Sequence, residues 1–285
     1  MKNNLTMILS IITINRNNAK GLEKTIQSVV NQSTKEFEYV VVDGASSDES
    51  VDVIKKYASQ HQIVWVSERD NGIYNGMNKG IRMSSGEYIM ILNSGDCLAD
   101  NQVVERLLES IKTDNYPSIY YGNIIKIWPD GRTLIDHQLG GKYTMFSFYS
   151  GTLNPDGAMI QKRLFEQYGY FDEKMKICSD WAWLMNVLVF KRETAKHCNI
   201  NTIYFDMTGV SENGDKSRMT IQRERRQVLE EVLPPSVLAD YDRYADDIRM
   251  MQRIRRHKGA FKLVNIIERV LFKMEKRQFK RRGIK

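Results

Sequence analysis

The sequence is poor in the residues and runs that mark secreted and membrane-spanning proteins. Its 285 residues include three cysteines, with neither a CxxC pair nor the spacing of zinc ligands: Cys97, Cys178 and Cys198. An odd, scattered set argues against a disulfide framework and predicts reduced, structural thiols in an intracellular protein. The first apolar run, Leu5–Ile14, is short and interrupted by polar residues, and no run is long enough to cross a bilayer. Any membrane contact is therefore expected at the membrane surface.

Several motifs of nucleotide-binding and hydrolytic enzymes are also missing. The first apolar run leads into Asn15-Arg16-Asn17-Asn18, where a dinucleotide-binding fold needs glycines so that its backbone can approach a pyrophosphate. No GxxxxGK(S/T), GxSxG or HExxH pattern occurs, which argues against P-loop NTPases, α/β hydrolases and HExxH metalloproteases. The four histidines are scattered and are expected to be ordinary surface or core residues: His61, His137, His197 and His257.

Charge is distributed unevenly along the chain. Between Arg249 and Lys285 lie 14 Lys or Arg and two acids, so this tail carries a formal charge of +12. The whole chain carries +7, which leaves −5 for residues 1–248. The basic character therefore belongs to the tail, and the rest of the chain is mildly acidic.

The N-terminal part of the chain alternates between strand-like and helix-like segments. The expected strands are Leu5–Ile14, Glu38–Val42, Ile63–Val66 and Tyr88–Leu92, and the expected helices are Gly21–Gln32, Ser47–Gln60, Asn75–Met83 and Asn101–Lys112. Such alternation predicts an α/β fold with a mostly parallel sheet that is flanked by helices on both faces.

The second half of the chain is less regular. A turn at Pro129-Asp130-Gly131 predicts a hairpin between strands at Ile119–Ile127 and Arg132–Asp136. The other expected elements are a buried helix at Asp180–Phe190, a strand at Ile200–Phe205 and a charged helix at Ser217–Val232. We therefore predict a main domain at residues 1–232 and a basic helical C-terminal extension at residues 233–285.

Two aspartates follow expected strands at the edge where open α/β sheets bind ligands. Asp43 comes after the second strand and Asp96 shortly after the fourth. Because parallel strands present their carboxyl ends at one edge, these carboxylates are expected to gather there, where they suit a metal ion, a ribose or a basic leaving-group partner. Each of them, taken alone, could equally be a turn residue or a helix cap.

Four segments stand out together by their order and spacing. They are Thr13-Ile14-Asn15-Arg16, Val42–Asp48, Glu68–Gly80 and Leu92-Asn93-Ser94-Gly95-Asp96. At these segments the chain resembles the family 2 inverting glycosyltransferases, which have the GT-A fold, and the resemblance covers roughly residues 5–215. It departs from the family's usual Tyr-Asp-Ala-Met-Asn-Lys-Gly at Asn75-Gly76, which replaces Asp-Ala.

The resemblance implies an enzyme that binds a nucleotide-sugar donor. It implies donor-binding roles for ten residues: Thr13, Asn15, Arg16, Asp43, Asp70, Gly72, Asn78, Lys79, Ser94 and Asp96. Asp96 also matches the metal-binding position of the family's DxD motif, of which only the last acid is present here. A divalent cation, Mg²⁺ or Mn²⁺, is the expected cofactor, because hard cations take oxygen ligands and share them with phosphates.

By the same resemblance Asp180 is the catalytic base that deprotonates the acceptor hydroxyl. Asp156 and Trp181 are candidates for binding the acceptor, although Asn154-Pro155-Asp156-Gly157 replaces a His-Gln pair of many relatives. The alternatives are that Asp180 is the N-cap of a helix at Trp181–Phe190 and that Trp181 belongs to the core.

The basic tail has an apolar stripe at helical spacing: Leu263, Ile267, Val270, Leu271 and Met274. Lys262, Arg269, Lys273 and Lys276 surround this stripe. A basic amphipathic helix is typical of a segment that lies on an anionic membrane surface. The alternative is a helix that packs on the main domain, whereas nucleic-acid binding is not expected because no motif for it occurs.

We therefore predict a metal-dependent inverting glycosyltransferase that acts on a glycan or lipid-linked glycan in cell-surface polysaccharide synthesis. It is expected in the cytoplasm, peripheral at the inner face of the cell membrane. One alternative is a sugar nucleotidyltransferase, which would carry a GxGxR loop where this chain has Asn15–Asn18. The other is a catalytically inactive, membrane-associated scaffold of the same fold, which would hydrolyse no sugar nucleotide.

Overall fold

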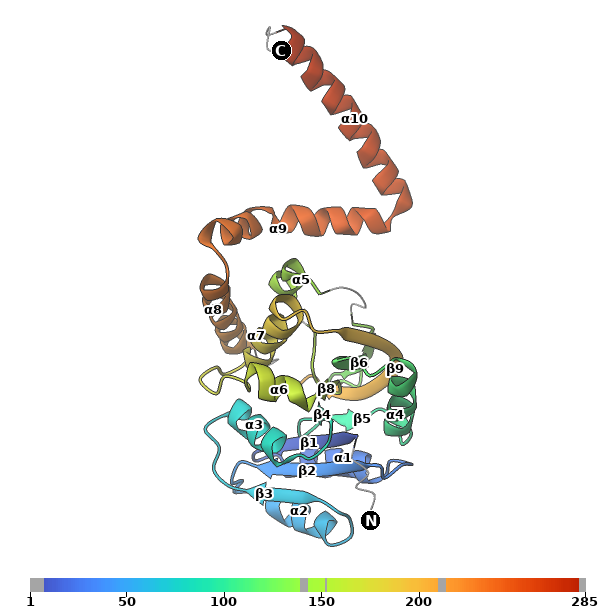
Figure 1. Ribbon diagram of the computed structural model, residues 1–285, viewed down its shortest axis with the longest axis vertical. Helices are drawn as coiled ribbons and strands as arrows, with labels where there is room; N and C mark the ends of the chain where they lie inside the picture. The colour runs from blue at the N-terminus through green and yellow to red at the C-terminus, as the bar shows by residue number, and fades with distance from the viewer. Residues whose placement is uncertain (1–7, 139–142, 152, 210–213, 282–285) are drawn as a thin grey trace. The chain divides into compact units, whose positions relative to one another are not determined.

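The computed structural model describes residues 8–138, 143–151, 153–209 and 214–281 (Figure 1). Leu5–Met7 of the first expected strand lie outside these residues. The chain divides into two compact units, Met1–Val228 and Leu229–Lys285, while the domain boundary expected after residue 232 stays a prediction. In the described part of the chain, no helix is both long and apolar enough to cross a membrane.

A nine-stranded sheet is the framework of the first unit, with strand order β3-β2-β1-β4-β8-β6-β9-β5 and with β7 paired to β6. Its parallel part consists of β1 (Leu9–Asn15), β2 (Phe37–Asp43), β3 (Val64–Ser67) and β4 (Tyr88–Ile91). Every residue of β1 is buried, as expected for a central parallel strand that helices cover on both faces. The predicted α/β class is confirmed.

The other strands extend the sheet in mixed directions. β8 (Met159–Gln161) runs antiparallel to β4 and β6 (Ile119–Ile127), whereas β9 (Ala195–Asp206) runs parallel to β6. β7 (Thr133–Asp136) forms with β6 the hairpin that was expected at the Pro-Asp-Gly turn. The short β5 (Cys97–Leu98) was not predicted; it pairs antiparallel with β9 and thereby brings the segment after β4 against the end of β9.

Helices cover both faces of the parallel strands (Figure 1). On one face α1 (Ala19–Val30), α2 (Ser50–Ala58) and α4 (Val103–Thr113) share a hydrophobic core with residues such as Leu9 and Ile11. α3 (Ile73–Met83) packs on the other face, where a Cβ at Gly80 would lie 2.4 Å from Ile12 Cγ2. Glycine at this position therefore permits the close approach of α3 to β1.

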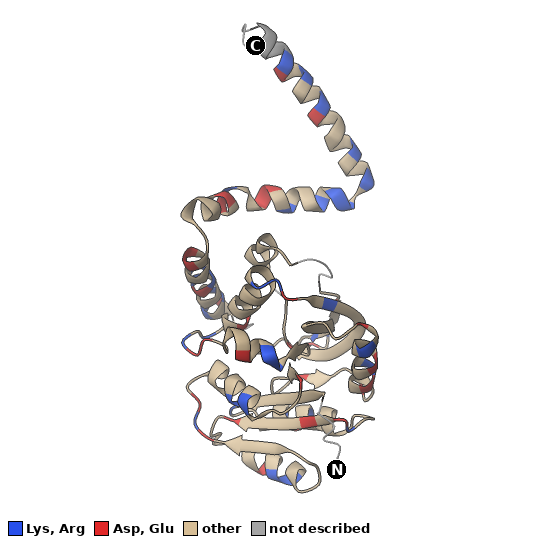
Figure 2. Ribbon diagram, in the orientation of Figure 1, with Lys and Arg blue, Asp and Glu red and all other residues tan. Residues whose placement is uncertain are grey.

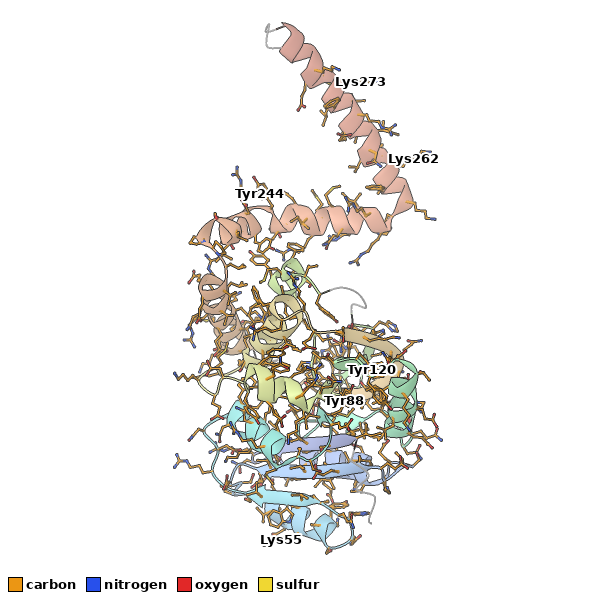
Figure 3. All side chains as sticks on the ribbon, in the orientation of Figure 1. Lys55, Tyr88, Tyr120, Tyr244, Lys262 and Lys273 are labelled. Carbon is orange, nitrogen blue, oxygen red and sulfur yellow. The ribbon has the colours of Figure 1, made fainter. Side chains whose placement is uncertain are left out.

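Large buried side chains tie the central strands to their surroundings. Tyr88 donates a hydrogen bond to the carbonyl oxygen of Pro117 at 2.8 Å, and the Tyr120 hydroxyl lies 2.5 Å from Ser110 Oγ (Figure 3). Buried tyrosine hydroxyls are usually paired in this way, because an unpaired one costs free energy.

A second group of helices completes the first unit: α5 (Met145–Ser150), α6 (Lys162–Tyr168), α7 (Ser179–Met185) and most of α8 (Gly214–Val232). The helix expected at Asp180–Phe190 is observed as α7 followed by one π-helical turn, Asn186–Phe190. Aromatic packing joins α6 to α7, since the rings of Phe165 and Trp183 stack with centroids 4.3 Å apart.

The second unit is helical. α9 (Pro235–Arg256) begins with proline in its first turn, where the missing N–H is not needed, and α10 (Lys258–Arg281) follows it directly. Lys and Arg are frequent along both helices (Figure 2). The helical character that was predicted for the basic tail is therefore observed.

Candidate active site

A cavity of about 610 Å³ lies where β1 and β4 end, and the start of α3, the loop before α7 and the end of β9 complete its wall. This volume is within the range of small-molecule sites. The cavity brings together eight of the predicted site residues: Asn15, Arg16, Asp70, Gly72, Ser94, Asp96, Asp156 and Asp180. It is therefore the candidate active site.

Asp43 is fully buried and does not line the cavity, although it is hydrogen-bonded to Asn15, which does. Its carboxylate accepts hydrogen bonds from Asn15 Nδ2 at 2.8 Å, from Ser46 N at 2.9 Å, from Ser46 Oγ and from Ser67 Oγ at 2.7 Å. Burial raises the pKa of Asp43, but these hydrogen bonds outweigh it and hold the pKa below its ordinary value. Asp43 thus fixes the ends of β1 and β2, and its direct contact with a donor stays a prediction.

Asp70 and Lys79 form an ion pair at the edge of the cavity. Lys79 Nζ lies 2.6 Å from Asp70 Oδ1 and 3.0 Å from Glu68 Oε1, so it neutralises acids and does not line the cavity itself. The Asp70 carboxylate packs closely against two glycines. A Cβ at Gly44 would lie 2.9 Å from Asp70 Oδ2, and a Cβ at Gly76 would lie 3.0 Å from it. The Gly76 that departs from the family pattern therefore leaves room for Asp70.

Two further residues with expected donor-binding roles point into the core. Thr13 is buried, and its Oγ1 lies 3.1 Å from the Tyr39 hydroxyl. Asn78 is 1% exposed and donates hydrogen bonds of 2.9 Å to the carbonyl oxygen of Phe171 and to Glu173 Oε1. These side chains position β1 and α3 and do not face the cavity, and a donor-binding role for either residue stays a prediction.

Asp96 lies on the cavity wall with 4% of its surface exposed. Its Oδ1 accepts a hydrogen bond of 2.8 Å from the backbone N–H of Asp206, the last residue of β9. Burial raises the pKa of Asp96 to about 7; the backbone N–H of Asp206 opposes this rise and the Asp206 charge adds to it. Asp206 also lines the cavity, so two carboxylates meet there.

Asp156 is a third carboxylate of the cavity and accepts a hydrogen bond from Asn93 Nδ2 at 3.1 Å. Burial, followed by the charges of Asp96 and Asp180, raises the pKa of Asp156 well above its ordinary value. Asp156, which the sequence analysis proposed as an acceptor-binding residue, therefore lies close enough to interact electrostatically with Asp96, the expected metal ligand, and with Asp180, the expected base.

Asp180 lies in the first turn of α7, and its carboxylate faces the cavity. Its Oδ1 accepts a hydrogen bond of 2.9 Å from the backbone N–H of Trp181 and lies 2.9 Å from the Tyr74 hydroxyl. Burial raises the pKa of Asp180, against these hydrogen bonds and the charge of Arg225. The N-cap of α7 is Cys178, so the alternative that Asp180 caps this helix is wrong.

Trp181 belongs to the core, which corrects its expected role in binding the acceptor. It is 2% exposed, and its indole N–H is shared between the carbonyl oxygens of Phe148, at 3.2 Å, and Gly151, at 3.1 Å. A buried ring with a satisfied N–H offers no face to a sugar.

Three residues around the cavity were missed by the sequence reasoning. Tyr74 touches Asp180 and lies within a segment that carried the resemblance, so its spacing from Gly72 was a usable signal. Asp206 is the last residue of β9, as Asp43 is the last residue of β2. A search for acids at the ends of strands could therefore have found it. Glu224 on α8 accepts three backbone hydrogen bonds from Lys176, Ile177 and Cys178, and no local pattern marks it.

The residues of the cavity fit a divalent cation that is held jointly with a bound diphosphate. No three His, Cys, Asp or Glu side chains gather as a metal site among the residues that the structure describes. Asp96, however, presents a hard oxygen ligand on the wall, and a Cβ at Gly95 would fill space 3.4 Å from Asp206 Oδ2. Phosphate oxygens of a ligand would have to complete the coordination of such an ion.

Comparison with known proteins identifies the family of the chain. Residues 10–191 match the family described as Glycosyl transferase family 2, and the chain belongs to that family. A glycosyltransferase of PGL/p-HBAD biosynthesis from Mycobacterium bovis is 23% identical over 177 residues, which cover 61% of this chain and 67% of that protein. A cholesterol galactosyltransferase from Borreliella burgdorferi is 30% identical over 108 residues, or 38% of this chain and 30% of that protein.

Solved structures of glycosyltransferases share the fold. TarS of S. aureus in complex with UDP-GlcNAc superposes with a TM-score of 0.62 and 18% identity, over 81% of this chain and 69% of that chain. The mannosyltransferase PcManGT of Pyrobaculum calidifontis, in complex with GDP-Man and Mn²⁺, gives a TM-score of 0.56 and 15% identity over 76% of this chain and 60% of that chain. The GT-A expectation for the first unit is thereby confirmed.

Proposed function

We propose that this chain is a metal-dependent inverting glycosyltransferase that moves a sugar from a nucleoside-diphosphate sugar to an acceptor hydroxyl. The observation that carries the proposal is the cavity at the ends of β1 and β4, where Asp96 and Asp180 face one space. Membership of Glycosyl transferase family 2 supports the reaction class.

Asp180 is the general base of the proposed reaction. It takes the proton of the acceptor hydroxyl as that oxygen attacks the anomeric carbon, while the bond from this carbon to the diphosphate breaks and the nucleoside diphosphate leaves with the electron pair. A single displacement inverts the anomeric configuration. The raised pKa of Asp180 supports this role, because a base works best when its pKa approaches the working pH.

Tyr74 holds the Asp180 carboxylate in place. Its hydroxyl lies 2.9 Å from Asp180 Oδ1 and 2.5 Å from the carbonyl oxygen of Ile177, and its single proton can serve only one of them at a time. Asp180 can therefore keep a lone pair for the acceptor proton while its orientation is fixed from two sides, by Tyr74 and by the backbone N–H of Trp181.

Asp96 holds the divalent cation, Mg²⁺ or Mn²⁺. When bound, such an ion neutralises the diphosphate and makes it a better leaving group. Asn15, Arg16 and Ser94 line the same cavity and contribute polar groups for the donor. Asp156, hydrogen-bonded to Asn93, is the proposed contact for the acceptor.

The acceptor in this proposal is a lipid-linked glycan or glycolipid of the cell surface, reached from the cytoplasmic face of the membrane. A relative named as a cholesterol galactosyltransferase supports a lipid acceptor. The apolar stripe of α10 supports attachment to a membrane surface: Leu263, Ile267, Val270, Leu271 and Met274 are each 49–58% exposed. Lys262 and Lys273, labelled in Figure 3, lie on the same helix and suit anionic headgroups.

A second copy of the chain is a poorer partner for this stripe. A two-stranded coiled coil needs a narrow apolar seam with charged flanks, whereas Ile266 and Leu271 widen the apolar face here. Pairing two tails would also bring two segments of charge +12 together, from Arg249 to Lys285 in each copy. An anionic lipid surface complements the same charge.

The activity is tested with a panel of UDP-, GDP- and TDP-sugars in the presence of Mn²⁺. Binding is measured by thermal shift and turnover by released nucleoside diphosphate, with and without lipid-linked glycans as acceptors. We expect one nucleotide class to stabilise the protein in a Mn²⁺-dependent manner and to be released faster with an acceptor. Absence of binding and release across the whole panel would contradict the proposal.

A further inference from the structure

The carboxylates of Asp96 and Asp206 both line the cavity, and each has one oxygen without a hydrogen-bond partner among the described residues. Asp96 is 4% exposed, and the only hydrogen bond to its carboxylate from the described residues goes to Oδ1, from the backbone N–H of Asp206. The Asp206 side chain accepts two bonds at Oδ1, from Thr208 N at 2.8 Å and Thr208 Oγ1 at 2.7 Å. In the part of the chain that is described, Oδ2 of both aspartates is left without a hydrogen bond.

The pairing of β5 with β9 brings Asp96 and Asp206 close together. β5 pairs antiparallel with β9 in a register that sets Cys97 opposite Tyr204, so Asp96 and Asp206 follow on at the same end of the pair. Gly95 keeps the space beside Asp206 open: it has φ of +113°, and a Cβ there would lie 3.4 Å from Asp206 Oδ2. Any other residue at position 95 would be strained and would occupy space beside the carboxylate.

The charge of the cavity wall is unbalanced. Asp96, Asp156, Asp180 and Asp206 line it, whereas the basic side chains on the wall are Arg16 and Lys176. None of the ion pairs found among the described residues involves any of these four aspartates; Asp70, in contrast, is paired with Lys79. Carboxylates gathered in a partly buried site must either bind protons, as the raised pKa values of Asp96, Asp156 and Asp180 indicate, or be balanced by a positive charge such as a metal ion.

We propose that Asp206 is a second protein ligand, alongside Asp96, of a divalent metal ion that also binds the donor diphosphate. The inference rests on the proposed glycosyl transfer for the nature of the ligand, and it adds a residue that the DxD resemblance does not assign. Two carboxylate oxygens from the chain, phosphate oxygens from the nucleotide and water form a set of hard ligands suited to Mn²⁺ or Mg²⁺. Asp206 thereby substitutes for the acid that the shortened DxD motif lacks.

Binding of Mn²⁺ to the full chain tests this ligand without reference to turnover. Free Mn²⁺ is followed by electron paramagnetic resonance in titrations with and without UDP or GDP. Asp206→Asn keeps the shape and the acceptor oxygen for Thr208 but removes the charge. We expect Asp206→Asn to weaken Mn²⁺ binding by at least about tenfold. Asp130→Asn, in the exposed β6–β7 hairpin, is the matched control and should bind as the unaltered protein does.

A second variant gives an independent test in case the amide of Asp206→Asn disturbs the structure around Asp96. Asp206→Cys replaces a hard ligand by a soft one, so it should lose Mn²⁺ and gain Cd²⁺ relative to the unaltered protein. A thiolate-to-Cd²⁺ charge-transfer band in the ultraviolet would identify the new sulfur as a ligand. Asp130→Cys should show no such band.

The outcomes separate the inference from the function on which it rests. If Asp96→Asn loses Mn²⁺ while Asp206→Asn binds it as tightly as the unaltered protein, Asp206 is not a ligand and only this inference fails. If the unaltered protein binds no Mn²⁺ even with nucleotide present, both the inference and the metal dependence of the proposed function are overturned.

Discussion

Glu224 of α8 accepts a hydrogen bond from the backbone N–H of Cys178 at 3.0 Å, two residues before Asp180. The same carboxylate accepts the N–H of Lys176 at 2.8 Å and that of Ile177 at 3.0 Å. Glu224 lies outside residues 10–191, which match the family. A helix beyond the family match therefore sets the position of the loop that carries Lys176 and Ile177 into the cavity and leads to Asp180.

Glu224→Gln should destabilise the first unit, because the amide keeps one acceptor oxygen and turns its NH₂ toward either the N–H of Lys176 or the N–H groups of Ile177 and Cys178. We expect the free energy of unfolding to fall by about 1–3 kcal/mol, measured by urea unfolding of the full chain. Transfer should slow while nucleotide affinity changes little, since the loop leads directly into the first turn of α7, where the base Asp180 lies. Glu231→Gln, exposed on the same helix, is the control; equal effects of the two substitutions would argue against a positioning role.

Asp43→Asn should act mainly on stability. Four hydrogen bonds converge on this fully buried carboxylate, and bonds to a charged group contribute about 1.5–3 kcal/mol each to stability. Because the pKa of Asp43 is held below its ordinary value, its contribution is present above that value and is lost as the pH falls through the folded-state pKa. Urea unfolding as a function of pH measures this, with exposed Glu49→Gln as the control. Loss of nucleotide binding without loss of stability would instead favour direct donor contact.

The pH dependence of stability should carry a signature of Asp96. Burial raises its pKa from 3.8 to about 7 in the folded chain, so the protonated form is preferred there. The contribution of Asp96 to stability is complete below about pH 3.8 and is lost as the pH rises through about 7. In metal-free protein the free energy of unfolding should fall between about pH 3.8 and pH 7 because of Asp96. We expect this fall to be smaller in Asp96→Asn, as measured by urea unfolding at a series of pH values.

Mn²⁺ should reverse that loss, because it replaces the proton on Asp96. The rise in melting temperature on adding Mn²⁺ should be larger at about pH 8 than at about pH 5, since protons compete with the metal for the ligand. An Mn²⁺ effect that is equal at both pH values, or that survives in Asp96→Asn, would show that the ion binds elsewhere.

The apolar stripe of α10 predicts attachment to anionic vesicles. Ile267→Glu places a charge within the stripe and should reduce co-sedimentation about tenfold, since one buried aliphatic side chain contributes about 1.5–3 kcal/mol. Phe272→Glu is the matched control, because Phe272 follows Leu263 by nine residues and so lies on the opposite side of the helix. Binding should also weaken with salt and vanish on neutral vesicles. Equal loss in both variants, or a stable dimer with no vesicle binding, would contradict the membrane role.

The regular part of the fold could be predicted because its signals are local. Alternating apolar periodicity located β1 to β4 and α1 to α4 to within a few residues, and the turn at Pro129-Asp130-Gly131 located the β6–β7 hairpin. The two-residue β5 could not be predicted, since its only basis is pairing with β9.

The resemblance identified candidate site residues, but it did not determine which of their side chains face the cavity. Asp96 and Asp180 were found by resemblance, and both face the cavity. Thr13 and Asn78 belong to the same motifs, yet they point into the core, because the packing around β1 and α3 decides which way a side chain turns. Asp206 reaches Asp96 across 110 positions of sequence, a contact that no local pattern records.

The most direct test compares Asp180→Asn with the unaltered protein, using the nucleotide sugar that the donor panel identifies. The amide keeps the size of the side chain and its acceptor oxygen but cannot take the acceptor proton. We expect donor affinity within about twofold and transfer reduced by at least about a hundredfold, the usual scale of general-base catalysis. Transfer by Asp180→Asn at the rate of the unaltered protein would contradict the assignment of Asp180 as the base.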